Sequence, residues 1–123
     1  MYNETVIDHF NNPRNIGELA EVSAIGEASS SSCGDTTFIY LQIENGIIID
    51  ARFKTFGCAA AIAAASILTT LIIGNSLEMA KAISNDDVIA ALGGLPEKKI
   101  SCAALATDAL HKAIEEYENE QQK

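Results

Sequence analysis

The sequence of 123 residues has few cationic side chains and no recognisable leader segment. Eight lysines and arginines stand against 17 aspartates and glutamates, which gives a formal net charge of −9. Because nucleic-acid backbones and anionic membranes both require a basic face, this balance argues against either as the main partner. No charged-then-apolar leader with a small-residue cleavage site begins the chain, so secretion is not expected. The length predicts one compact domain over residues 1–123, and 48% apolar residues are enough to build its core.

The usual catalytic groups are also scarce. There is no tryptophan, no glycine-rich phosphate loop and no Ser-His-Asp arrangement, and the two histidines lie far apart. We expect His9 to be a surface or packing residue and His111 to be solvated. The three cysteines are an odd number, whereas a disulfide framework in a small secreted domain favours an even one. The thiols are therefore expected to be reduced, in a cytoplasmic protein.

One long uncharged run, from Thr55 to Leu77, has the length of a membrane-spanning helix. Much of it is alanine, however, which is only weakly apolar, and it also contains glycine, serine and threonine. It lacks basic flanks and begins as the tail of an alternating strand. We therefore expect the buried central helix of a small domain rather than a membrane span.

A β-hairpin is the clearest local feature. Apolar residues alternate along 38–43, and Asn45-Gly46 suits a tight turn because both residues tolerate a positive φ. The return arm is expected to direct one set inward, namely Ile47, Ile49, Ala51 and Phe53, and another outward, namely Asp50, Arg52 and Lys54. A weaker strand is expected over Val22–Ala28, before a polar run, Ser29–Ser32, that we expect to be mobile.

Helices are expected on both sides of this hairpin. The first covers Tyr2–Phe10 and stops before Pro13. Later helices are expected over 59–73, over 77–83, after the capping sequence at Ser84, and over 101–118. The last has a buried stripe of Ala106, Ala109, Leu110, Ala113, Ile114 and Tyr117, with Lys112, Glu115 and Glu116 outside. These elements predict an α+β fold, a small antiparallel sheet of about three strands packed on one face by several helices.

The residues best suited to chemistry are Cys33, Asp35, Cys58 and Cys102. All three cysteines fall at the ends of expected elements, and Cys58 and Cys102 fall at helix N-termini, where thiolate is favoured over thiol. Asp35 follows Cys33 closely enough to share a metal ion with it. Thiolates bind soft metals and attack sulfur, but a lone cysteine is usually only a small buried apolar residue. Because no C-x-x-C pair is present, spacing alone leaves a metal or sulfur site and simple packing both open.

Several stretches in one order resemble the IscU type of iron–sulfur cluster assembly scaffold, which is similar to the N-terminal domain of NifU. They are Val6-Ile7-Asp8-His9-Phe10, Asn12-Pro13-Arg14-Asn15-Ile16-Gly17, Cys33-Gly34-Asp35, Asp50-Ala51-Arg52-Phe53-Lys54-Thr55-Phe56-Gly57-Cys58, Leu95-Pro96 and Lys99-Ile100-Ser101-Cys102. The likeness covers nearly the whole chain.

The resemblance implies a scaffold or carrier rather than a turnover enzyme. A cysteine desulfurase would hand over persulfide sulfur, iron would arrive, and a labile [2Fe–2S] cluster would form and pass to acceptor apo-proteins. Cys33, Cys58 and Cys102 would be thiolate ligands and Asp35 the carboxylate at the fourth position. Cys102 would be the first persulfide acceptor, with Cys33 as a second. A hard oxygen ligand beside soft thiolates would give the cluster an exchangeable corner.

The chain also departs from the family, most clearly at two places. The family usually has histidine before the last cysteine, where this chain has Ser101, so the fourth ligand stays open. The segment implied to bind an Hsp70 and J-protein pair is Leu-Pro-Pro-Val-Lys in the family. Here it is Leu95-Pro96-Glu97-Lys98-Lys99. Without a long insertion between Cys58 and Cys102, the chain is closer to IscU than to SufU.

Two other functions compete with the scaffold. The first is a zinc-bound sulfur acceptor that activates the desulfurase, in which Cys33, Asp35, Cys58 and Cys102 would supply a tetrahedral site in the cluster-free form. The second is an interaction module whose thiols are merely packed. The sequence does not separate the first alternative from the scaffold, because zinc and a cluster use the same ligands.

Overall fold

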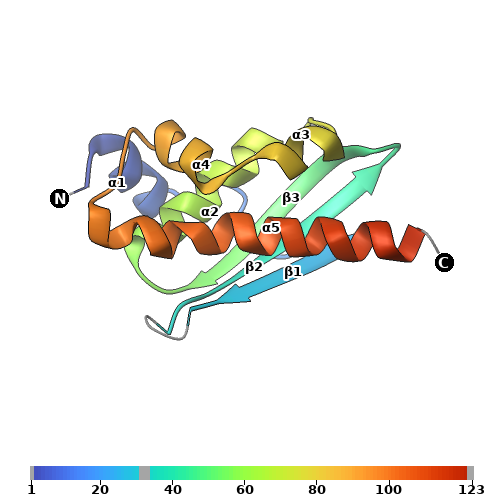
Figure 1. Cartoon of the computed structure of the whole chain (residues 1–123), viewed down its shortest axis with the longest axis horizontal. Helices are drawn as coiled ribbons and strands as arrows, with labels where there is room; N and C mark the ends of the chain where they lie inside the picture. Colours follow the sequence, from blue (N-terminus) through green and yellow to red (C-terminus); the bar gives the residue numbers. More distant parts are fainter. Residues whose placement is uncertain (1, 31–33, 122–123) are drawn as a thin grey trace.

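The structure is a computed structural model that describes residues 2–30 and 34–121. Helix α1 (Glu4–Asn11) precedes three strands, β1 (Ala24–Ser29), β2 (Thr36–Glu44) and β3 (Ile47–Phe56). Four helices follow, α2 (Ala59–Ile72), α3 (Leu77–Ala82), α4 (Asn85–Ala91) and α5 (Ile100–Gln121), with a short 3-10 turn, η1 (Glu97–Lys99), before α5. The strands form one antiparallel sheet in the order β1-β2-β3, and helices cover one face of it (Figure 1), which confirms the α+β prediction.

The β2–β3 hairpin turns at Asn45 (φ 54°) and Gly46 (φ 76°), as predicted. Its register shifts at a β-bulge, because Gln42 pairs with Asp50 but Ile43 pairs with Ile48. The bulge reverses the alternation of β3 on the turn side of Asp50, at residues 47–49. The predicted inward placement of Ile47 and Ile49 is therefore wrong: Ile48 is fully buried, Ile47 is half-buried and Ile49 is 39% exposed. Ala51 and Phe53 do face the core.

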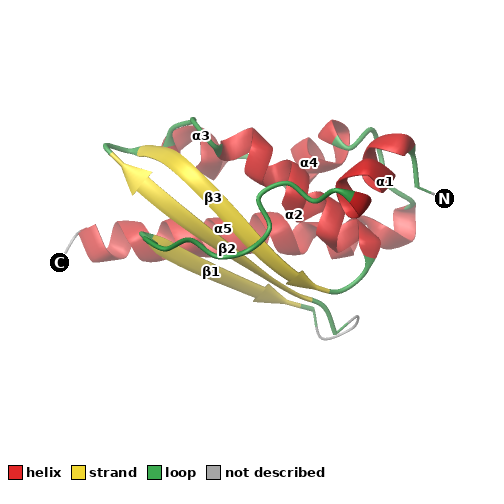
Figure 2. Cartoon of the chain, turned by 180° about the vertical axis from the view of Figure 1, so that it is seen from behind, coloured by secondary structure: helices red, strands yellow, loops and turns green. Residues whose placement is uncertain are grey.

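The outer face of the sheet is less open to solvent than the sequence suggests. The loop between α1 and β1 crosses this face (Figure 2), and its residues 15–17 pair with Phe53 at the free edge of β3. Lys54 forms an ion pair of 2.5 Å with Glu18, and Arg52 donates to the Asn15 side chain over 3.0 Å. The predicted outward residues Asp50, Arg52 and Lys54 are consequently half-buried.

Helices α2 and α5 form the layer against the inner face. Ten of the 14 residues of α2 are buried, and six of these are small alanine or serine residues that permit close packing. The uncharged run from Thr55 to Leu77 is thus divided between the end of β3 and the buried helix α2. Within the described ranges no helix is both long enough and apolar enough to cross a bilayer. The predicted stripe of α5 is confirmed, with Tyr117 half-buried and the rest buried.

The remaining elements follow local capping signals. Ser76 caps α3, and Ser84 forms a capping box with Asp87 at the start of α4. Strand β1 begins two residues later than predicted and includes Ser29, whose hydroxyl lies 3.1 Å from that of Thr36. Ser29 is therefore part of the sheet rather than of a mobile run, while residues 31–32 of that run lie outside the described residues.

The two histidines are both packed. His9 is 8% exposed, and its Nδ1 lies 2.7 Å from the Ser66 hydroxyl. His111 is half-buried, with a buried Nε2 that has no hydrogen-bond partner among the described residues. The expectation that His111 is solvated is therefore wrong in this respect, because α3 and α4 also pack against α5.

Candidate metal centre

Three of the four predicted ligands come from different parts of the fold and meet at one end of it. Asp35 directly precedes β2. Cys58 is the N-cap residue of α2, and Cys102 is the third residue of α5. In Figure 1 the starts of α2 and α5 lie at the same end of the molecule, near the loop that joins β3 to α2. Antiparallel pairing of β2 with β3 brings Thr36 opposite Phe56, which places Asp35 next to Cys58.

The distances suit a common metal ion. A carboxylate oxygen of Asp35 and the Sγ atoms of Cys58 and Cys102 all lie within 4.8 Å of one another. In a tetrahedral zinc site with Zn–S bonds of about 2.3 Å, neighbouring ligand atoms lie about 3.5–3.8 Å apart. Side-chain movements on the order of 1 Å would therefore close these three groups on one ion. Residues 2–30 and 34–121 contain no second group of three such ligands.

Gly57 makes room for the carboxylate of Asp35. A Cβ atom on Gly57 would lie 2.5 Å from Asp35 Cγ and 2.7 Å from its Oδ2, closer than real Cβ contacts. The next residue, Cys58, donates its backbone N–H to Asp35 Oδ2 over a long 3.4 Å. The start of α2, with its unpaired N–H groups, thus faces the carboxylate. This role of Gly57 was not predicted from the sequence, although a glycine between a strand and a candidate ligand is a signal for close backbone approach.

The site is enclosed on its Cys102 side. Asp35 is 7% exposed, Cys102 is 4% exposed and Cys58 is half-buried. Cys102 forms a small buried cluster with Ala60 and Ala61 of α2, and the side chains that pack against this cluster are Tyr2, Cys58 and Leu95. An apolar surround of this kind would limit the access of water to a metal ion held there.

Cys33, the remaining predicted ligand, lies outside the described residues. The chain on either side of it is held in place, because Ser30 N–H donates to Asp35 O over 2.9 Å and Gly34 N–H donates to Ser30 O over 2.8 Å. Three of the four predicted ligands are therefore brought together in the described part of the chain, and the position of the fourth stays a prediction.

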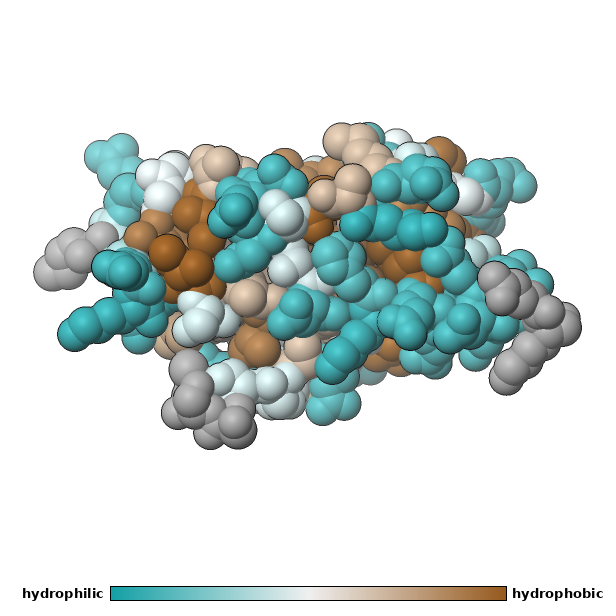
Figure 3. All heavy atoms as spheres, in the orientation of Figure 1, coloured by the Kyte–Doolittle hydropathy of each residue, from teal (hydrophilic) through white to brown (hydrophobic). Residues whose placement is uncertain are grey.

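Two segments named by the resemblance border the site. Ser101 is an exposed residue of α5, next to Cys102. The segment from Pro96 to Lys99 lines a hollow of about 520 Å³ together with Tyr2. Figure 3 shows that apolar surface gathers near the end of the molecule where α5 begins, whereas the later turns of α5 are covered by hydrophilic side chains.

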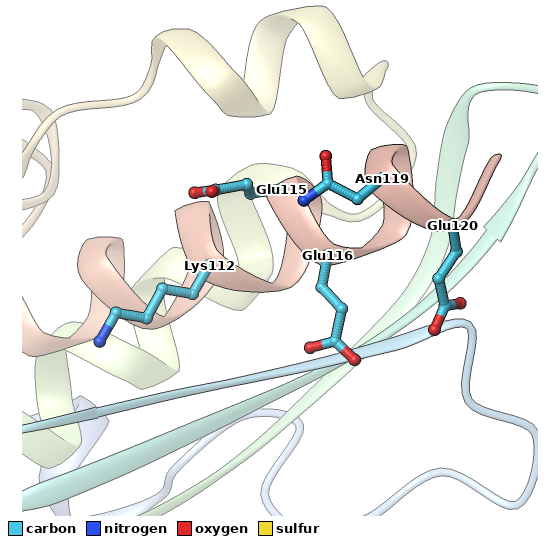
Figure 4. A pocket seen from close by; sticks show the side chains of 5 residues that line it. All are labelled: Lys112, Glu115, Glu116, Asn119 and Glu120. Carbon is cyan, nitrogen blue, oxygen red and sulfur yellow. The ribbon is translucent and has the colours of Figure 1, made fainter. Parts of the chain in front are cut away.

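A second hollow, of about 530 Å³, lies on the later turns of α5. Figure 4 shows that its lining side chains, Lys112, Glu115, Glu116, Asn119 and Glu120, all project from this one helix. They include no thiol or imidazole, and Lys112 lies ten residues beyond Cys102, about 15 Å along the helix axis. The hollow is thus separate from the candidate metal centre.

Comparisons with known proteins place this geometry in a family. The sequence model described as "NifU-like N terminal domain" matches residues 1–123. The iron–sulfur cluster assembly scaffold protein IscU 1 of Archaeoglobus fulgidus is 45% identical over 117 residues, which cover 95% of this chain and 76% of that protein. IscU of Escherichia coli is 42% identical over 125 residues, covering 98% of this chain and 97% of that protein.

A structural comparison agrees on the fold. The crystal structure of a NifU-like N-terminal protein from Brucella abortus superposes with a TM-score of 0.79 at 23% identity, over 96% of this chain and 94% of that one. The resemblance inferred from the sequence is confirmed by these matches. On the combined evidence of sequence and fold, the chain belongs to the family of NifU-like N-terminal domains, and IscU scaffold proteins are among its relatives.

Proposed function

We propose that this protein is a scaffold on which an iron–sulfur cluster is assembled and from which it is transferred. The observation that supports this most directly is the meeting of Asp35, Cys58 and Cys102 within 4.8 Å. The names of the sequence relatives support it independently, since they are scaffold proteins at more than 40% identity. In this role the protein is a carrier in the cytoplasm rather than an enzyme.

The proposed ligand set is Cys33, Cys58 and Cys102 with Asp35. Thiolates bind iron and sulfide firmly, whereas a carboxylate is a harder and more exchangeable ligand for iron. A protein that stores a cluster would hold it best with four thiolates. A protein that transfers its cluster benefits from one ligand that a thiolate of the acceptor protein can replace. The mixed set therefore favours transfer over storage, and a [2Fe–2S] cluster is the smallest that it would hold.

Sulfur delivery requires a partner that supplies persulfide, and we propose a cysteine desulfurase for this role. Cys102 and Cys33 are the proposed acceptors of that sulfur. Each sulfane sulfur must gain two electrons to become sulfide, so assembly also needs a reductant. Acceptor apo-proteins would take the finished cluster, and an Hsp70 and J-protein pair would bind Leu95–Lys99, where Glu97 and Lys98 depart from the family's segment.

The decisive experiment is anaerobic reconstitution. The protein is incubated with a cysteine desulfurase, cysteine, ferrous iron and a thiol reductant, and the visible spectrum is recorded with the iron, sulfide and zinc contents. We expect thiolate-to-iron charge-transfer bands with two irons and two sulfides per cluster. The variants Cys58→Ser and Cys102→Ser should lose these bands, while Ser76→Cys, far from the site at the start of α3, should retain them.

The same experiment separates the alternatives. Stoichiometric zinc that iron does not displace, with no charge-transfer bands, would identify a zinc-bound sulfur acceptor, for which the same ligands suffice. If the protein binds neither a metal ion nor a cluster, the interaction module with merely packed thiols is the remaining alternative. Either result would overturn the scaffold proposal.

A further inference from the structure

The side chain of Asn3 joins two distant parts of the chain. Its Oδ1 accepts the Val6 N–H over 2.9 Å and so caps α1. Its Nδ2 donates to Leu92 O over 2.9 Å and to Gly94 O over 3.3 Å, just beyond α4. The Asn3 amide therefore accepts a backbone N–H at the start of α1 and also joins the N-terminal segment to the loop that leads towards α5.

The residues next to Asn3 and to Gly94 pack against the buried cluster that contains Cys102. Tyr2 precedes Asn3, and Leu95 follows Gly94. Both side chains pack against the buried cluster of Ala60, Ala61 and Cys102. Cys102 is 4% exposed, whereas Cys58 of the same site is half-buried. Tyr2 and Leu95 are thus two of the described side chains that would have to move to widen access to Cys102.

The two hydrogen bonds that Asn3 donates are weak enough to open. The hydrogen bond to Leu92 O is only partly buried and the one to Gly94 O is exposed, so water can replace either at small cost. Local opening of segments held by such bonds is a common low-energy fluctuation. The positions of Tyr2 and Leu95 thus depend on part-buried and exposed hydrogen bonds, whereas the core is held by buried apolar packing.

We propose that Asn3 is a positioning residue that controls access to the Cys102 thiol. Its two donated hydrogen bonds hold Tyr2 and Leu95 across Cys102, and their breakage exposes this thiol while Cys58 and the rest of the fold are unchanged. The significance of this opening for sulfur delivery rests on the proposed function, but the opening itself is a property of the metal-free chain.

The test measures alkylation rates of individual thiols with iodoacetamide in the metal-free, reduced protein, followed by peptide mass spectrometry. Asn3→Asp keeps the oxygen that caps α1 but replaces both donors by an oxygen facing two carbonyls. We expect Cys102 to react about tenfold faster, because two neutral hydrogen bonds are lost, and Cys58 to react at its original rate. Asn3→Ser, which adds no charge, should change the Cys102 rate in the same direction.

Asn75→Asp is the matched control. Asn75 also donates its Nδ2 to a carbonyl, that of Leu71 over 2.6 Å, but at the far end of α2, about 20 Å along the helix axis from Cys58. This variant should leave the Cys102 rate unchanged. An unchanged Cys102 rate in both Asn3 variants would overturn the proposal, and so would an equal rise at Cys58, which indicates general loosening. The test measures only thiol alkylation in the metal-free protein. Its outcome therefore does not depend on whether the protein assembles a cluster.

Discussion

The backbone of Gly57 lies so close to the carboxyl group of Asp35 that no Cβ atom fits between them. A methyl group at Gly57 would come within 2.5 Å of Asp35 Cγ, 2.7 Å of Oδ2 and 2.9 Å of Cβ. The absence of a side chain at Gly57 is therefore what allows Asp35 to face Cys58 and Cys102. This contact gives a way to move one proposed ligand without removing it.

We expect Gly57→Ala to weaken zinc binding by at least about tenfold, because the displaced carboxylate no longer meets the two thiols. The free energy of unfolding of the metal-free protein should fall by only about 1–2 kcal/mol, since the side chain of Asp35 can turn away. A competition titration with a chromophoric chelator measures the affinity, and urea denaturation measures the stability.

A double-mutant cycle with Asp35→Ala supplies the control. If Gly57→Ala acts through Asp35, it should have little further effect on zinc affinity once that carboxylate is gone. Additive losses in the double variant would show instead that the alanine disturbs the thiols directly.

The second prediction concerns Asp35 itself. Asp35→Ala should lower zinc affinity on the order of a hundredfold, because one ligand of the proposed set is lost. The metal-free variant should be no less stable than the original protein, since alanine avoids the cost of burying a carboxylate that is 7% exposed. Calorimetric titration with zinc and thermal unfolding of the metal-free protein measure the two quantities.

Asp50→Ala is a suitable comparison for this variant. Asp50 also lies on the sheet and pairs with Arg52 at 2.7 Å, but it belongs to β3 well before Cys58. Zinc affinity should be unchanged in this variant. A metal-free Asp35→Ala protein that unfolds more readily than the original protein would indicate a structural role for Asp35 and contradict the prediction.

The sequence predicts local features of this fold well and the bulge in β3 not at all. Alternation fixes the inward placement of Ala51 and Phe53, and Asn45-Gly46 fixes the turn. Residues 47–49, however, are three consecutive isoleucines, so any one of them satisfies the apolar pattern. Only pairing with Ile43 decides that Ile48 is buried, and that pairing depends on the register across the strands.

The candidate site, like the fold, is predicted from the sequence only in part. The positions of Cys58 and Cys102 at helix starts follow from local signals, but their meeting with Asp35 is a long-range contact that spacing does not encode. The family resemblance supplied that expectation. The link from Asn3 to Leu92 spans 89 residues and lies outside the stretches that resemble the family, so the sequence did not predict it.

The third prediction tests how closely β1 lies against α5. A Cβ atom at Gly26 would lie 1.9 Å from Ala109 O and 2.7 Å from Ala113 N, both backbone atoms that cannot turn aside. Gly26→Ala should therefore lower the free energy of unfolding by about 3 kcal/mol or more, as β1 and α5 are forced apart. Urea denaturation followed by circular dichroism measures this loss.

Gly46→Ala separates this steric effect from the general cost of replacing glycine. Gly46 has φ 76° with nothing within 4 Å of an added Cβ, so the expected loss is about 1–2 kcal/mol from backbone conformation alone. Equal losses at the two positions would mean that β1 can move away from α5 at little cost.

The fourth prediction follows from the environment of His9. Burial lowers the pKa of His9 below its usual 6.5, because the imidazolium loses hydration, and the positive charge of Arg14 lowers the pKa further. The negative charge of Asp8 acts in the opposite direction. The folded protein therefore binds a proton at His9 less readily than the unfolded chain does.

The sign of the pH effect follows from this difference. Above pH 6.5 His9 is neutral in both the folded and the unfolded state, and the stability is fully retained. As the pH falls below 6.5, the unfolded chain binds a proton at His9 more readily than the folded protein does. The free energy of unfolding therefore decreases. We expect the metal-free protein to be less stable at about pH 5.5 than at about pH 7.5. His9→Asn places a non-titrating amide opposite the Ser66 hydroxyl and should reduce this difference. Urea denaturation of both proteins at the two pH values, with a chelator present, measures it. If the two proteins lose equal stability on acidification, the pH dependence comes from other groups, since only the titration of His9 distinguishes them.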